Sequence, residues 1–106
     1  MTAAELIRSL PSRLKPDAGK GIDIIYHFKI SGEEGGEFTV RVNDGVASVE
    51  DGLHGDPKCI VEGKDKDYED VMYGRTNAQM AVLMGKIKVS NVGSMLKFVD
   101  MFEREF

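Results

Sequence analysis

The chain has 106 residues, 42% of them hydrophobic and 30% charged, which is typical of one compact domain over residues 1–106 rather than of a disordered chain. Its formal net charge is −4, and residues 31–70 hold twelve acids against four bases. Nucleic-acid binding needs a continuous basic face, so this distribution argues against nucleic acid as a partner.

The two ends of the chain are mildly basic. Residues 1–20 and 71–106 each have a net charge of +2. Such ends can favour an anionic lipid head group or membrane surface, although solvated charges on helix exteriors are the simpler explanation. Transient membrane contact is therefore compatible with the sequence but not required by it.

The number of cysteines and the lengths of the apolar runs indicate the cellular compartment in which the protein is expected. Cys59 is the only cysteine, which excludes an intrachain disulfide and a zinc site of the clustered-cysteine kind. Residues 1–20 lack the apolar core of a secretory signal, and no run reaches the ~18 apolar residues of a membrane span. We therefore expect a cytoplasmic protein.

Helix signals open the chain. Thr2 and Glu5 have the spacing of a capping box, in which a hydroxyl and a carboxylate satisfy free amides of the first turn. Leu6 and Leu10 share one face of the helix that follows. Pro11 should end or kink this helix, because proline has no amide hydrogen.

Alternating apolar and polar residues predict four strands in the next part of the chain. These strands are expected at 22–30, 38–42, 46–50 and 58–63. The glycine-rich residues 31–36 and the Asn-Asp-Gly sequence at 43–45 predict the first two hairpin turns. Because all the connections are short, the pattern favours an antiparallel meander with a single buried face.

The last third changes to helical spacing. Asp65 or Asp67 can cap one helix, and Asn77 can cap a second one. Residues 78–84 of that second helix leave almost no polar face, so it should be buried or should face something apolar. Gly85 fits the left-handed position just past its end.

A short strand and a last helix complete the prediction. Residues 86–89 alternate lysine with isoleucine or valine, and the final helix should begin near Asn91. Helical spacing gives it an inner stripe of Val92, Met95, Leu96, Val99 and Phe102. Three further apolar residues fall outside the stripe: Phe98, Met101 and Phe106. Helices covering one face of a mainly antiparallel sheet make an α+β domain.

Patterns for catalysis or metal binding are weak. His27 and His54 lie in a strand and a loop without the spacing of a metal site. Cys59 has no sequence partner that would activate it, so we expect a buried structural thiol. The acids at 65–70 lack the glycine and final glutamate of an EF-hand loop. We therefore expect no enzyme activity, no metal and no cofactor.

Methionine is concentrated in the last third, at Met72, Met80, Met84, Met95 and Met101. Its flexible, polarisable side chain suits surfaces that repack around varied ligands. An ordinary core filled with methionine is the alternative interpretation.

Three segments carry a resemblance to a known family: PSRLKPDAGKGIDIIYHFKISGEEGGEFTVRVNDG, CIVEGKDKDYEDVMYGRTNAQMAVLMGKIKVSN and VGSMLKF. Together with the order of the predicted elements over about residues 5–100, they resemble the sterol carrier protein 2 (SCP2-like) domain family. Two positions differ from the family pattern. Ala78 stands where the family often has proline, and Ser90-Asn91-Val92 replaces its common Gly-Asn or Gly-Asp.

The resemblance implies an α+β fold with a five-stranded, predominantly antiparallel sheet and helices on one face. It also implies a non-catalytic lipid carrier, with a fatty acid, acyl-CoA, sterol or phospholipid chain in an apolar tunnel between sheet and helices. The side chains expected to line this site are Phe38, Val40, Met72, Met80, Leu83, Met84, Met95, Leu96, Val99 and Phe102. The alternative is a protein-interaction or homodimerisation module that uses the apolar C-terminal helix.

Overall fold

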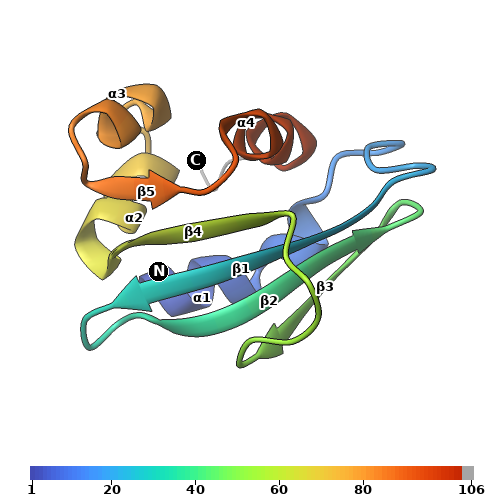
Figure 1. The fold of residues 1–106 in the computed structure, drawn as a ribbon, viewed down its shortest axis with the longest axis horizontal. Helices are drawn as coiled ribbons and strands as arrows, with labels where there is room; N and C mark the ends of the chain where they lie inside the picture. Colours follow the sequence, from blue (N-terminus) through green and yellow to red (C-terminus); the bar gives the residue numbers. More distant parts are fainter. Residues whose placement is uncertain (104–106) are drawn as a thin grey trace.

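The computed structural model describes residues 1–103, which form a five-stranded sheet with helices packed against one face (Figure 1). The helices are α1 (Ala3–Arg8), the 3-10 helix η1 (Leu10–Arg13), α2 (Asp65–Met72), α3 (Ala78–Leu83) and α4 (Val92–Met101). The strands are β1 (Asp23–Ser31), β2 (Gly36–Asn43), β3 (Val46–Asp51), β4 (Cys59–Lys64) and β5 (Ile87–Val89). The predicted α+β class is confirmed.

The strand order is β3-β2-β1-β4-β5, so the predicted antiparallel meander is wrong for its fourth strand. β4 lies beside β1 and runs parallel to it, whereas all the other neighbouring pairs are antiparallel. This makes β4 an interior strand, and its residues Cys59 and Val61 are completely buried. A polar turn of a few residues is compatible with either arrangement, so the local sequence could not decide between them.

The connection from β3 to β4 crosses the outer face of the sheet (Figure 1). The hydroxyl of Thr39 on β2 accepts a hydrogen bond from the N–H of His54 at 2.8 Å and donates one to the carbonyl oxygen of Gly52 at 2.8 Å. The ring of His27 on β1 donates to the carbonyl oxygen of His54, also at 2.8 Å. These bonds explain why Thr39 and His27 are buried although they point away from the helices.

Aromatic rings fill the space between the sheet and the helices. Tyr26 and Phe28 of β1 are completely buried. The ring of Phe98 on α4 lies 5.1 Å from that of Tyr26 and 5.4 Å from that of Phe28, in edge-on or tilted geometry. Tyr68 of α2 meets Phe28 edge-on at 5.9 Å. A centre packed in this way leaves the edge of the sheet as the place for a ligand site.

The helix α4 is rotated relative to the sequence prediction. Its buried side chains are Ser94, Met95, Phe98 and Met101. Val92 and Leu96, which were expected in the inner stripe, are exposed, while Phe98 and Met101 belong to the core. The helix has two apolar faces roughly a third of a turn apart, and periodicity alone could not tell which one meets the sheet. Phe106 lies outside the described residues.

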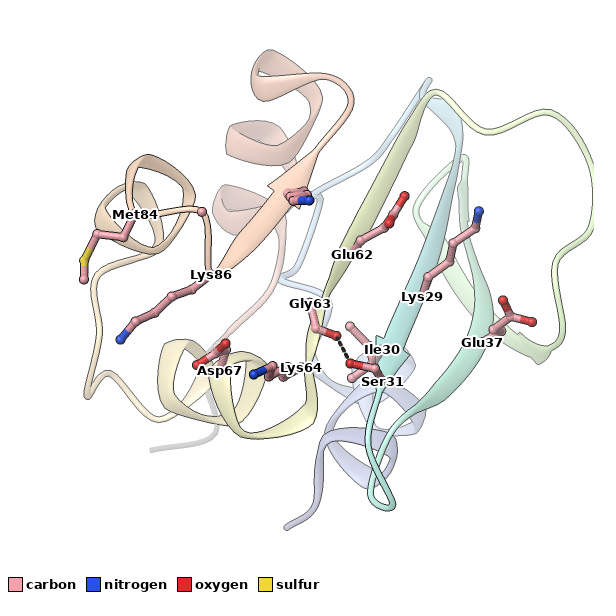
Figure 2. Close-up of a pocket in the computed structure, with 12 residues that line it drawn as sticks. Lys29, Ile30, Ser31, Glu37, Glu62, Gly63, Lys64, Asp67, Met84 and Lys86 are labelled. Atoms are coloured by element: carbon pink, nitrogen blue, oxygen red, sulfur yellow. Dashed lines mark hydrogen bonds between the residues drawn. The ribbon is translucent and has the colours of Figure 1, made fainter.

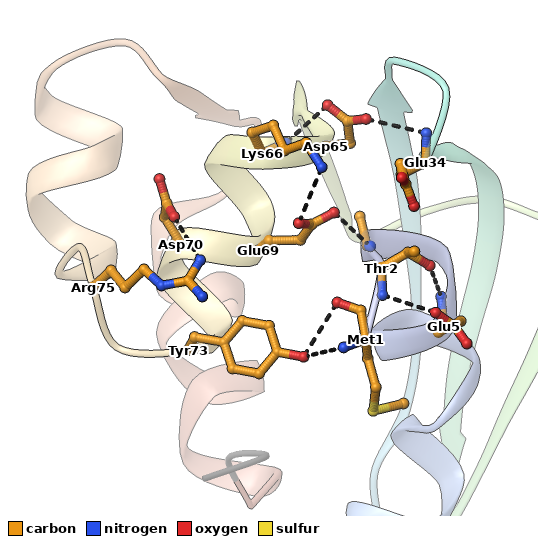
Figure 3. A network of polar contacts seen from close by, with 11 residues as sticks. Met1, Thr2, Glu5, Glu34, Asp65, Lys66, Glu69, Asp70, Tyr73 and Arg75 are labelled. Carbon is orange, nitrogen blue, oxygen red and sulfur yellow. Dashed lines mark hydrogen bonds and ion pairs between the residues drawn. The ribbon is translucent and has the colours of Figure 1, made fainter.

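Polar contacts join the start of α1 to α2 (Figure 3). The predicted capping box is confirmed, since Thr2 accepts from the N–H of Glu5 at 3.2 Å and Glu5 accepts from the N–H of Thr2 at 2.9 Å. Glu69 of α2 accepts from the N–H of Ala3 at 3.0 Å, which satisfies a further free amide of α1. The two helices are therefore held in register at one end.

Asp65 has a different role from the predicted one. The cap residue of α2 is Lys64, whose side chain makes no capping bond, so neither Asp65 nor Asp67 is the N-cap. Asp65 is the first helical residue, and its carboxylate accepts hydrogen bonds from the N–H of Glu34 at 3.1 Å and of Lys66 at 2.8 Å. It thus ties α2 to the β1–β2 turn.

Candidate functional site

A groove of about 300 Å³ lies between α3, β5 and α4, at the edge of the sheet. It is lined by Ala78, Gln79, Val82, Leu83, Val89, Val92, Met95, Leu96 and Val99. Gln79 is the only polar side chain in this set, so the groove offers almost purely apolar contact. Leu83 and Leu96 line it and remain exposed, so the groove opens to the surface. We call it the α3–α4 groove.

Asn77 and Gly85 fix the short helix that forms one wall. The Asn77 side chain accepts from the N–H of Gln79 at 2.8 Å and of Met80 at 3.3 Å, as predicted for a cap. Gly85 has a φ of 75°, and the N–H of Lys86 then bonds to the carbonyl oxygen of Ala81 at 2.9 Å. This glycine-dependent helix end turns the chain directly from α3 into β5.

The opposite wall is α4, held by contacts at its first turn. The Asn91 side chain accepts from the N–H of Ser94 at 3.0 Å. The carbonyl oxygen of Ser94 also accepts a hydrogen bond of 2.8 Å from the hydroxyl of Tyr26, which ties the helix to β1. Phe98 packs on the sheet, which leaves the second apolar face of α4 for the groove. That face consists of Val92, Met95, Leu96 and Val99.

The structure brings together four of the ten side chains predicted for the site: Leu83, Met95, Leu96 and Val99. Phe38 and Val40 are core residues of β2, and β1 and β4 separate them from β5. Their distance from the groove follows from the strand order, which the sequence did not reveal.

The other four predicted residues do not line the groove either. Met72 packs half-buried against the core. Phe102 is buried beside Phe98, with ring centroids 4.7 Å apart. Met80 and Met84 are exposed on α3 outside the groove.

Five groove residues were missed from the site: Ala78, Gln79, Val82, Val89 and Val92. The sequence carried a signal for the three valines, since they belong to the apolar helix, to the alternating strand and to the stripe of the last helix. Ala78 belongs to the same apolar helix, whereas the polar Gln79 had no such signal, and only its place in the first turn of α3 brings it to the groove.

A larger, more open cleft of about 650 Å³ lies on the other side of β5 (Figure 2). Its charged lining residues are Lys29, Glu37, Glu62, Lys64, Asp67, Lys86 and Lys88. Charges of both signs line this cleft, and Ile30 and Met84 are the only large hydrophobic residues in its lining. This cleft is a poorer host for an apolar ligand than the smaller groove.

Cys59 and His54, which lie outside the groove, both have structural partners. Cys59 is completely buried, burial raises the pKa of its thiol, and its sulfur lies 3.5 Å from the carbonyl oxygen of Asn91. His54 bonds through its ring to the carbonyl oxygen of Asp51 at 2.9 Å. Among residues 1–103, no group of three or more His, Cys, Asp or Glu side chains could hold a metal ion. Within the same residues, no helix is both long and apolar enough to cross a bilayer.

The fold and the groove are those of a small α+β domain that can bind an apolar ligand at a sheet edge. The chain belongs to the SCP-2 sterol transfer family, whose model matches residues 4–103. The family predicted from the sequence is therefore confirmed, and with it a general role in lipid binding or lipid transfer. No curated protein matches the sequence.

Solved structures of several proteins share this fold. Palmitated SCP2L2 from Aedes aegypti matches with a TM-score of 0.72 and 17% identity over 100% of both chains. The apo form of sterol carrier protein 2 from Yarrowia lipolytica matches with a TM-score of 0.59 and 24% identity, over 88% of this chain and 87% of that one. At these identities the likeness shows the fold alone.

A domain of an enzyme is also similar. The sec-alkylsulfatase Pisa1 from Pseudomonas sp. matches with a TM-score of 0.79 and 14% identity, over 92% of this chain. This chain spans only 16% of the length of the alkylsulfatase and of its double mutant.

Proposed function

We propose that this domain is a non-catalytic lipid carrier that holds an acyl chain, as a fatty acid, acyl-CoA or phospholipid, or a sterol, in the α3–α4 groove. The observation that carries the proposal is the groove itself, in which eight of nine lining side chains are apolar. The palmitated state of the Aedes aegypti protein supports a fatty acyl ligand. A cytoplasmic location stays a prediction.

The energetics favour an open, exchangeable site. A sealed empty cavity costs ~24 cal/mol per Å³, so the groove volume of about 300 Å³ would cost about 7 kcal/mol if it were closed and dry. An open groove avoids that cost by admitting water or ligand. Burying ten methylenes of a ligand chain contributes about 8 kcal/mol to binding before other terms are counted. The entropy that the ligand loses on association offsets much of this binding free energy. Micromolar, releasable binding follows, which suits a carrier.

The lining predicts weak head-group selectivity. Gln79 is the only polar side chain of the groove, so few fixed hydrogen bonds are available to a ligand head group. The expected tunnel between sheet and helices stays a prediction, since aromatic rings occupy that space in the present structure.

No catalytic step is assigned to the domain. A nucleophile needs exposure and a lowered pKa, whereas Cys59 is completely buried and its pKa is raised. Turnover of an acyl ester that is lost in Cys59→Ala would contradict this assignment.

Homodimerisation is the competing use of the same surface. Phe98 and Met101 suggested it as surplus apolar residues, but both lie in the core. On α4, the apolar side chains that remain available for self-association are the exposed Val92 and Leu96. Sedimentation of the protein with and without bound lipid distinguishes the two roles, because a monomer that still binds lipid supports the carrier.

The proposal is tested by native mass spectrometry of the purified protein and by displacement of a fluorescent fatty acid. We expect a bound lipid and saturable displacement. Leu96→Asp places a carboxylate in the apolar wall and should weaken displacement by more than tenfold. The matched control is Val46→Asp, because Val46 is 68% exposed on β3 and lies outside the groove. Absence of bound lipid together with absence of saturable displacement would refute the carrier function.

A further inference from the structure

We propose that α3 seats this domain on the surface of an anionic bilayer, with Met80, Leu83 and Met84 in contact with lipid and Lys86 in contact with the head groups. The three apolar side chains are 51%, 81% and 59% exposed. They belong to one short helical segment whose only polar side chain between Asn77 and Gly85 is Gln79. Apolar side chains gathered in this way on a surface mark a contact with lipid or with a partner.

The positive charge of the surrounding segment favours an anionic bilayer as the partner of this surface. Residues 71–99 contain four cations, Arg75, Lys86, Lys88 and Lys97, and no Asp or Glu, although the whole chain has a net charge of −4. In Figure 2 the side chain of Lys86 points to the same side as that of Met84, away from the sheet. A lysine close to an anionic membrane contributes about fivefold in affinity.

Carboxylates near the segment leave Lys86 available. Asp70 is engaged by Arg75 at 3.1 Å. Glu62 lies opposite Lys88 in the β4–β5 pair. Asp67 lines the same cleft as Met84 and Lys86, and it forms no ion pair with Lys86. Lys86 forms no ion pair with any residue up to 103, so its charge remains free to meet a lipid phosphate or carboxylate.

A second copy of the chain is a less suitable occupant of this surface. In a two-fold dimer each patch meets its own copy, so Lys86 and its neighbouring cations would face the same cations across the interface. Repulsion of this kind disfavours self-association through α3. An anionic lipid surface, in contrast, complements both the apolar and the cationic side chains.

The proposed docking surface on α3 and the α3–α4 groove share one residue. Leu83 is the most exposed of the three apolar side chains and also lines the α3–α4 groove. Docking through α3 therefore sets the open side of the groove against the bilayer, where a lipid can exchange without crossing water. This last step rests on the proposed carrier function, whereas the docking itself does not.

The experiment is flotation of the full chain with vesicles of phosphatidylcholine alone and with vesicles that also contain phosphatidylserine. We expect binding to the anionic vesicles only, weakened by high salt. Met80→Ser/Met84→Ser should reduce this binding by more than tenfold, since it removes the apolar contact. Lys86→Glu should reduce it by at least about fivefold. Fatty-acid displacement in solution should stay unchanged in the double variant, because neither methionine lines the groove.

Matched controls are Val46→Ser, an exposed valine on β3, and Lys20→Glu, an exposed lysine before β1; both should bind vesicles as the unmodified protein does. No binding to anionic vesicles, or equal binding to neutral ones, would overturn the proposal, as would unchanged binding of Met80→Ser/Met84→Ser. A dimer that dissociates in this variant would assign the surface to a second copy instead. Lost vesicle binding with intact displacement refutes only the docking surface, whereas vesicle binding without displacement refutes only the carrier.

Discussion

The hydroxyl of Tyr26 donates a 2.8 Å hydrogen bond to the carbonyl oxygen of Ser94 in the interior of the domain. The two residues are 68 positions apart in the chain, and the bond joins the central strand β1 to the first turn of α4. Burial raises the pKa of Tyr26, so the hydroxyl stays a neutral donor across the physiological range. One wall of the groove is therefore anchored directly to the sheet.

Replacing this anchor gives the first prediction. Tyr26→Phe keeps the ring that packs on Phe98 but removes the donor, so the free energy of unfolding should fall by about 1 kcal/mol. Urea denaturation followed by circular dichroism measures the change. An unchanged midpoint would show that the bond contributes nothing to the stability of the fold.

Tyr68 gives the opposite prediction and a matched comparison. Its side chain is 2% exposed, and its hydroxyl has no hydrogen-bond partner among the described residues. A buried polar group without a partner is destabilising, so Tyr68→Phe should leave the free energy of unfolding unchanged or raise it by ~1 kcal/mol. The same urea titration checks this, and a clear loss of stability would reveal a bound water or another partner at the hydroxyl.

Ligand length should determine affinity if the groove holds an acyl chain. Each buried methylene contributes ~0.8 kcal/mol, so the dissociation constant should fall about fourfold for each added methylene until the groove is full. Displacement titrations with a series of saturated fatty acids measure this dependence. Affinity that follows the head group instead of chain length would contradict the apolar groove as the binding site.

Acid sensitivity should depend on Asp65. Hydrogen bonds from the N–H groups of Glu34 and Lys66 hold the pKa of its carboxyl below the ordinary value near 4. A lowered pKa in the folded state stabilises the fold above the unfolded-state pKa, and this contribution is lost as the pH falls through the lower, folded-state pKa.

Asp65→Asn should therefore lower the free energy of unfolding at pH 7, with a difference from the unmodified protein that shrinks below about pH 4. Urea denaturation at a series of pH values measures it. Asp56→Asn, in the exposed connection before β4, is the matched control for replacing a surface aspartate. A difference that is constant with pH would mean that the carboxylate charge plays no part.

The sequence predicted the elements better than their arrangement. The capping box of Thr2 and Glu5, the cap at Asn77 and the left-handed Gly85 were all predicted, because each depends on hydrogen bonds and backbone angles within a few residues. The parallel pairing of β4 with β1 was not, since it depends on where a polar connection crosses the sheet.

The residues that line the groove were likewise predicted only in part from the sequence. Leu83 and Leu96 were both predicted to line the lipid site, and both line the groove, although Leu96 was also expected in the inner stripe of its helix. Phe38 and Val40 are equally apolar side chains, in an alternating strand, but they lie in the core of β2. The amount of apolar surface was visible in the sequence, whereas its division between core and groove was not.

The sequence by itself thus determined the family, the α+β class, the absence of a recognisable catalytic motif, and the helix ends at Thr2, Asn77 and Gly85. These features follow from local periodicity, capping and residue chemistry. Only the tertiary structure decided which face of α4 meets the sheet, because that choice depends on residues far away in the chain. Tyr26 donates a hydrogen bond to Ser94, and both Tyr26 and Phe28 pack on Phe98. That rotation turns Val92 and Leu96 away from the core, leaves Val99 half-buried at its margin, and makes the groove.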